Sequence, residues 1–128
     1  MDEPMRVIEK VYAAFAAQDL DALLALCAPD IVVTQDPALP WGGEYKGPDG
    51  AATFVMKLIG ASESVVIPEQ LFAAGDDVIQ VGRTAGTVRS NGASFDIPEC
   101  HAWTVREGLV VRAQFFIDST AMLEAISR

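Results

Sequence analysis

The chain has 128 residues, 51% of them hydrophobic, and a formal net charge of −9. This length suits one domain over residues 1–128. Nine basic residues against eighteen acidic ones leave too little positive charge to neutralise the phosphates of nucleic acid or of an anionic membrane surface, so neither partner is expected. Two cysteines are too few for a disulfide framework or a paired-cysteine zinc site, and they fit a reducing cytoplasm. Neither a secretory signal nor an apolar run long enough to span a membrane is visible.

The first third of the chain predicts two helices and a short strand. Apolar residues recur at helical spacing over residues 3–17, which favours an amphipathic helix. Asp19 is a good N-cap for a second, short helix that ends at Pro29. The β-branched run at 31–35 is typical of a strand.

A loop with two large aromatic residues follows this strand. Residues 36–47 combine prolines and glycines with Trp41 and Tyr45, which indicates a lid or a buried plug. The simpler alternative is that Trp41 packs over an open edge of the core. Pro48 begins a third helix at a position where a missing N–H costs nothing, and Gly60 is a plausible stop for it.

The second half of the chain changes to strand periodicity. Extended segments are predicted at 64–74, 78–89, 94–106 and 109–117, and a last helix at 119–127. Hairpin turns are expected between them at 75–77, 91–92 and 107–108. Gly82 and Gly86 inside a strand mark a bend or bulge, and Pro98 indicates a bulge or an edge position. Helices segregated from a run of strands indicate the α+β class.

The hairpin at 99–118 holds the only histidine of the chain, His101. Without a bulge, Val105 faces Val110, and the pairs that follow are Trp103–Arg112, His101–Gln114, Glu99–Phe116 and Ile97–Asp118. Side chains alternate across a strand, so all of these are expected on one face. The small and apolar opposite face then carries Cys100, Ala102, Ala113, Phe115 and Ile117.

Five segments carry local patterns that occur together in one known fold: Tyr12–Leu23 with its A-Q-D-L-D-A-L hinge, Cys27–Val33, Tyr45–Ala51, Trp103–Val110 and Phe116–Asp118. In this order they resemble the nuclear transport factor 2-like superfamily, and within it the SnoaL-like and ketosteroid isomerase-like branch. The resemblance implies a cone: a strongly curved antiparallel or mixed sheet, wrapped by three to four helices around an apolar pocket. It also implies a homodimer that pairs sheet faces, which suits the high hydrophobic fraction.

The ketosteroid isomerase-like enzymes place a proton-abstracting carboxylate on the first strand. Counting from Asp19 without a gap puts Gln35 at that position, and one insertion puts Asp36 there. The family's tyrosine falls one place from Tyr12, and its strand acid falls on His101. The chain departs from the steroid isomerase pattern at two or three positions, so that activity is not expected.

SnoaL-like cyclases use an aspartate at the end of the last strand as general acid and base, with a histidine on the neighbouring strand. Asp118 and His101 match these positions in kind, and such a pair can move a proton near neutral pH. Each has a simpler alternative. Asp118 precedes Ser119 and could cap the last helix, and a lone strand histidine is commonly a satisfied core or interface residue.

These comparisons lead to two function classes. The first is a small cofactor-independent enzyme of isomerase, cyclase or dehydratase (lyase) type, acting by acid–base catalysis on an apolar, carbonyl-containing molecule. Its candidate proton-transfer residues are Asp118, His101, Asp36 and Gln35, and its candidate substrate-binding residues are Tyr12, Trp41, Phe54, Glu99, Trp103, Gln114 and Phe116. The second class is a non-catalytic domain that binds a small molecule or dimerises, with the aromatic residues filling the cone. Neither a metal nor a cofactor is expected, because no phosphate loop, nucleophile elbow or metal-ligand cluster is present in the sequence.

Overall fold

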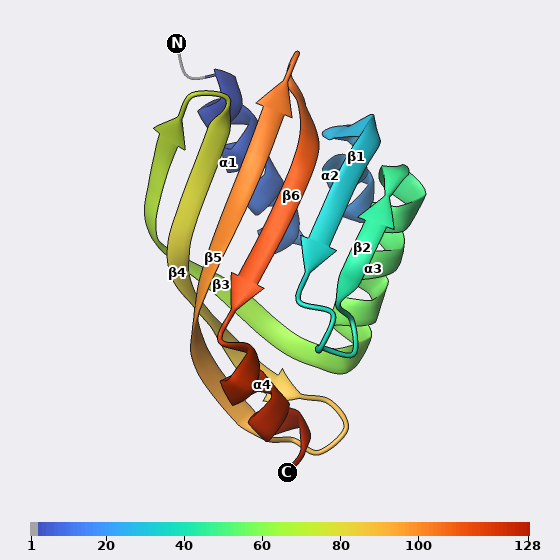
Figure 1. The fold of residues 1–128 in the computed structure, drawn as a ribbon, viewed down its shortest axis with the longest axis vertical. Helices are drawn as coiled ribbons and strands as arrows, with labels where there is room; N and C mark the ends of the chain where they lie inside the picture. Colours follow the sequence, from blue (N-terminus) through green and yellow to red (C-terminus); the bar gives the residue numbers. More distant parts are fainter. Residues whose placement is uncertain (1–2) are drawn as a thin grey trace.

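The fold is a curved six-stranded sheet with helices on its inner face (Figure 1). The computed structural model describes residues 3–128. In chain order the elements are α1 (Glu3–Ala17), α2 (Leu20–Ala25), β1 (Cys27–Gln35), β2 (Gly43–Lys46), α3 (Gly47–Ala61), β3 (Ser62–Ala74), β4 (Asp77–Val88), β5 (Ser94–Arg106), β6 (Leu109–Ile117) and α4 (Ser119–Ile126). The strand order is β2-β1-β6-β5-β4-β3, with β1 and β6 parallel and every other pair antiparallel. The predicted α+β class is therefore confirmed.

The predicted element order is confirmed except for one missed strand. The turn-like segment 36–47 contains β2, which pairs with the end of β1, Gln35 opposite Gly43. Gly43, the first residue of β2, has φ of 120°. The loop-like composition of segment 36–47 hid this short strand. Gly60 does not end α3, which continues to Ala61. No helix within residues 3–128 is long and apolar enough to cross a membrane.

The inner face of the sheet packs against α1, α2 and α3, and α4 lies at the lower end of β5 and β6 (Figure 1). Hydrophobic side chains of the three helices and of the central strands form one buried core, including Ile8, Val11, Ile31, Phe54 and Val78. This burial follows the predicted amphipathic pattern of α1. It leaves the polar residues of β4 and β5 that point inward enclosed by protein.

The register of the β5–β6 hairpin differs from the prediction beyond its first pair. Val105 does face Val110, but Thr104 then faces Arg112, so that Val111 is an extra residue in β6. A bulge of one residue exchanges the two faces of a strand. As a result Ala113, Phe115 and Ile117 lie opposite Trp103, His101 and Glu99 on the inner face. The predicted pairs of Arg112, Gln114, Phe116 and Asp118 with residues of β5 are wrong.

A second bulge lies in β3 rather than at Pro98. Pro98 pairs with Arg83 in an unbroken ladder, whereas the register of β3 shifts between Pro68 and Gln70, opposite Gly82. A Cβ atom at position 82 would collide with the backbone carbonyl of Ile67. The bulge predicted near Gly82 therefore lies in the neighbouring strand, and Gly82 itself meets the close approach of β3.

Candidate functional site

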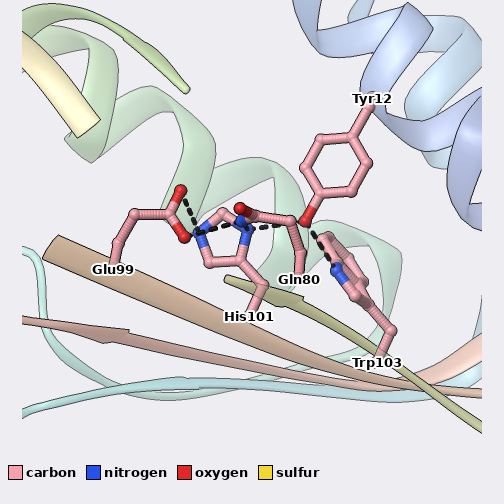
Figure 2. A network of polar contacts seen from close by, with 5 residues as sticks. All are labelled: Tyr12, Gln80, Glu99, His101 and Trp103. Carbon is pink, nitrogen blue, oxygen red and sulfur yellow. Dashed lines mark hydrogen bonds and ion pairs between the residues drawn. The ribbon is translucent and has the colours of Figure 1, made fainter. Parts of the chain in front are cut away.

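A polar cluster lies on the inner face where β4, β5 and α1 meet (Figure 2). Inward alternation on β5 places Glu99, His101 and Trp103 in a row, all buried. Gln80 of β4 is opposite His101 in the ladder and is also buried, and Tyr12 reaches the row from α1. Such a cluster needs internal partners for nearly every polar atom, because water does not reach it.

Tyr12 links the indole and the imidazole. Trp103 Nε1 lies 2.9 Å from the Tyr12 hydroxyl oxygen and can only donate, so that oxygen accepts. The same hydroxyl lies 2.8 Å from His101 Nδ1. The Gln80 amide nitrogen lies 3.2 Å from this Nδ1 atom. An amide nitrogen can only donate, so this network assigns Nδ1 as the acceptor and the imidazole proton to Nε2.

Glu99 is the carboxyl of this cluster. Its Oε2 accepts a hydrogen bond of 2.6 Å from the Gln80 amide. Its Oε1 has no hydrogen-bond partner within residues 3–128 and lies 3.5 Å from His101 Nε2. One oxygen of a buried carboxyl is therefore held in place, and the other remains free to accept or donate a proton.

Burial sets the charges of the cluster. It raises the pKa of Glu99 to about 7, although the hydrogen bond from Gln80 opposes this rise. It lowers the pKa of His101 to about 3, so the imidazole is neutral and its contact with Glu99 is not an ion pair. Burial also raises the pKa of the Tyr12 hydroxyl. Near neutral pH, Glu99 is the group in this cluster that exchanges a proton.

Aromatic rings fill the space beside the cluster. Phe115 contacts the rings of His101, Trp103 and Phe54, with centroids 4.7, 5.3 and 5.2 Å away. Phe54, Trp103 and Phe115, together with residues of α1, α2 and β1, line an apolar cavity of about 30 Å³. That space admits a water molecule but no organic substrate. The expected deep apolar pocket is therefore closed in this conformation.

A depression of about 320 Å³ lies on the surface near the ends of β1 and β6. Its walls are Asp36, Pro37, Phe115, Phe116, Ile117 and Ser119. Phe115 thus lines both the surface depression and the inner cavity.

The family model for the SnoaL-like domain matches residues 8–113. The chain belongs to the SnoaL-like domain family. No protein with a curated description matches it significantly.

Several solved structures share the fold of this SnoaL-like domain. An NTF2-like protein from Burkholderia thailandensis is 32% identical over 98% of both chains, with a TM-score of 0.90. An NTF2-like protein of unknown function from Burkholderia pseudomallei is 25% identical over 100% of both chains, with a TM-score of 0.92. TerC, co-crystallized with polyporic acid, is 23% identical over 99% of this chain and 100% of its own, with a TM-score of 0.89. The predicted superfamily and cone-like fold are confirmed.

In this SnoaL-like domain, Asp118 does not lie beside His101. Its exposed side chain accepts a 3.0 Å hydrogen bond from the Ala121 N–H and caps α4. The register instead places Phe115 opposite His101. The predicted pairing of these two residues is wrong, and the helix-cap alternative describes what Asp118 does. Asp118 lies away from His101 because the bulge in β6 shifts the end of that strand by one residue relative to β5.

Two predicted substrate-binding residues also lie on the wrong face. Gln114 and Phe116 point outward together with Cys100 and Ala102, and Phe116 is 53% exposed. The predicted division of the hairpin is therefore correct for the inner residues of β5 but reversed for β6 beyond the bulge.

The first-strand alternatives are resolved by burial. Gln35 is buried and accepts a 2.9 Å hydrogen bond from Trp41 Nε1, so Trp41 is a buried plug. Asp36 is exposed; its side chain accepts from the Ala38 N–H, and this bond together with one to Ser119 lowers its pKa. Gln35 is therefore the residue that points inward, with Phe115 between it and His101 in the sheet.

Gln80 is the site residue that sequence reasoning missed. It stands in the apolar run Val78-Ile79-Gln80-Val81, at an inner position of its strand. A glutamine in such a run is a signal, because a buried amide requires a partner. Within residues 3–128, no group of His, Cys, Asp and Glu side chains is arranged to hold a metal ion.

Proposed function

We propose that this domain is a cofactor-independent enzyme that moves a proton on an apolar, carbonyl-containing small molecule, with Glu99 as the group that takes and returns the proton. The observation that carries the proposal is the state of Glu99: a buried carboxyl with one unpartnered oxygen and a pKa raised to about 7. A general acid or base works best when its pKa is near the working pH. Isomerisation, cyclisation and dehydration next to a carbonyl each need a group that transfers a proton.

The proposed step starts from ionised Glu99. Its Oε1 takes a proton from the carbon next to the carbonyl; the C–H bond breaks, an O–H bond forms on Glu99, and the electron pair moves to the carbonyl oxygen as an enolate. Neutral His101 supplies its Nε2–H near this charge, without bringing a competing positive charge, while the Tyr12 O–H is donated to His101 Nδ1. Protonated Glu99 then returns the proton to carbon or oxygen, which restores the carboxylate. Asp118 has no part in this scheme, because it caps α4.

We infer that substrate enters beside Phe115, which lines both the surface depression of about 320 Å³ and the inner apolar cavity. Neither space is lined by Glu99, so the Phe115 ring must rotate away from His101 for substrate to reach the carboxyl. The rings along this route, Phe54, Trp103 and Phe115, favour an apolar ligand that contains rings. TerC, which has a similar fold, was co-crystallized with polyporic acid. This similarity supports a small-molecule ligand for this chain.

The test is exchange of hydrogen for deuterium next to a carbonyl. The wild type, Glu99→Gln and Asp118→Asn are incubated in D₂O at pH 7 with cyclic enones and 2-tetralone, and exchange is followed by proton NMR. We expect Glu99→Gln to lower the exchange rate by about 100-fold or more, since general acid–base catalysis contributes about 10²–10⁴-fold. Asp118→Asn is the matched control, because asparagine also caps helices well. Unchanged exchange in Glu99→Gln would exclude Glu99 as the proton-transfer group.

A second candidate is a non-catalytic domain that dimerises through the outer face of the sheet. Phe72, Val81 and Phe116 are exposed and lie on that face. Exposed apolar side chains gathered on one face are typical of an interface. Light scattering of the wild type and of Phe116→Asp tests this candidate: we expect a dimer that the aspartate dissociates. A wild-type protein that remains a monomer at all concentrations contradicts it.

A further inference from the structure

We propose that Gln80 is a positioning residue: its amide joins Glu99 to His101 and fixes the orientation of the carboxyl and the tautomer of the imidazole. The inference rests on the proposed acid–base function and deepens it. It names a residue that does not exchange a proton itself but determines how Glu99 does so.

The Gln80 amide reaches both of its neighbours in the cluster. Gln80 is 0% exposed, and its Nε2 lies 2.6 Å from Glu99 Oε2 and 3.2 Å from His101 Nδ1 (Figure 2). A primary amide nitrogen carries two N–H groups, so one can serve each neighbour. A donor at Nδ1 requires this nitrogen to be unprotonated, which leaves the imidazole proton on Nε2, the nitrogen 3.5 Å from the free oxygen of Glu99.

Gly82 leaves space for this amide. A Cβ atom at Gly82 would lie 2.6 Å from Gln80 Oε1 and would also collide with the backbone of β3. Gly82 faces Glu99 in the ladder, so the missing side chain lies beside the cluster. The glycine therefore lets the Gln80 amide lie flat against the sheet between Glu99 and His101.

The Gln80 amide is held by its nitrogen alone. Gln80 Oε1 is buried without a hydrogen-bond partner in the described part of the chain. The two N–H bonds therefore determine the orientation of the amide. The bond to Glu99 holds Oε2 of that carboxyl in place and leaves its Oε1 as the oxygen that exchanges the proton.

The test uses Gln80→Met, which keeps an unbranched side chain of similar length, with Gln70→Met on the exposed part of β3 as the matched control. Glu99 is titrated by ¹³C NMR of labelled glutamate, and His101 by ¹⁵N NMR. Since the chain has a single histidine, its nitrogen signals are unambiguous. In the wild type we expect a protonated Nε2 and an unprotonated Nδ1.

We expect Gln80→Met to move the titration midpoint of Glu99 upward, to give His101 mixed tautomers, and to move the pH dependence of deuterium exchange in the same direction. Gln70→Met should change none of these. Should Gln80→Met fail to fold, Gln80→Asn shortens the amide out of reach and carries the same expectation. A folded Gln80 variant with the wild-type midpoint and tautomer overturns the inference. Full exchange activity in Glu99→Gln instead overturns the proposed function, so the two failures are distinguishable.

Discussion

Replacing Glu99 by glutamine tests the buried carboxyl through protein stability, without any substrate. Burial raises the pKa of Glu99 from 4.5 to about 7 in the folded protein, so the folded state holds this proton more tightly than the unfolded state. The resulting stabilisation is fully present below pH 4.5 and is lost as the pH rises through about 7. At about 1.36 kcal/mol for each pKa unit, the loss amounts to about 3 kcal/mol. That is a large part of the roughly 5–15 kcal/mol that stabilises a typical domain.

The assay is urea unfolding of the wild type and Glu99→Gln between pH 4.5 and pH 8. Because glutamine has no proton to lose, the stability of the wild type relative to the variant should fall by about 3 kcal/mol across this range. Burial lowers the pKa of His101, so the stability that this residue contributes is lost as the pH falls below 6.5 toward about 3. This loss is the same in the wild type and in Glu99→Gln. Glu9→Gln, which removes an exposed carboxyl from α1, controls for net charge. Parallel stability curves for the wild type and Glu99→Gln would refute the reasoning.

Three further predictions concern stability, each measured by urea unfolding. Tyr12→Phe removes an acceptor and a donor from two buried partners and should cost about 1–3 kcal/mol; a cost near zero would show that the hydroxyl is not part of the network. Gly82→Ala should strongly destabilise the fold, because the added Cβ collides with a backbone carbonyl of β3. In the matched variant Gly60→Ala, the added Cβ meets nothing within 4 Å in α3, so this variant should stabilise the fold by about 0.5–1 kcal/mol. Equal effects of the two substitutions would contradict the close approach of β3. Asp118→Ala should cost about 1 kcal/mol through loss of the cap while deuterium exchange continues; lost exchange would return Asp118 to the mechanism.

Turn chemistry made the second half of the chain predictable. Gly92 and Gly108 both adopt positive φ, 70° and 76°, as the predicted hairpin turns require. Pro48 lies in the first turn of α3 as expected. These signals are local, since each turn or helix start depends on the residues that form it.

The bulge in β6 has no comparable local signal. Val111 is one of several apolar residues in that strand, and nothing in its neighbours distinguishes a register with it from one without it. The choice depends on which side chains of β6 are buried: the observed register buries Ala113 and Phe115 and exposes Phe116. That preference is set by packing against the helices, and it removed Asp118 from the predicted site.

Apart from β2, the sequence by itself determined the order of the elements. It also determined the inward row of Glu99, His101 and Trp103, because alternation along one strand is a property of that strand. Only the tertiary structure decided what this row meets. Tyr12 bonds to His101 across 89 positions of the chain, and Gln80 across 21. The charge state of Glu99 likewise comes from burial by distant elements. Contacts of this kind are made by folding, and no local pattern in the sequence encodes them.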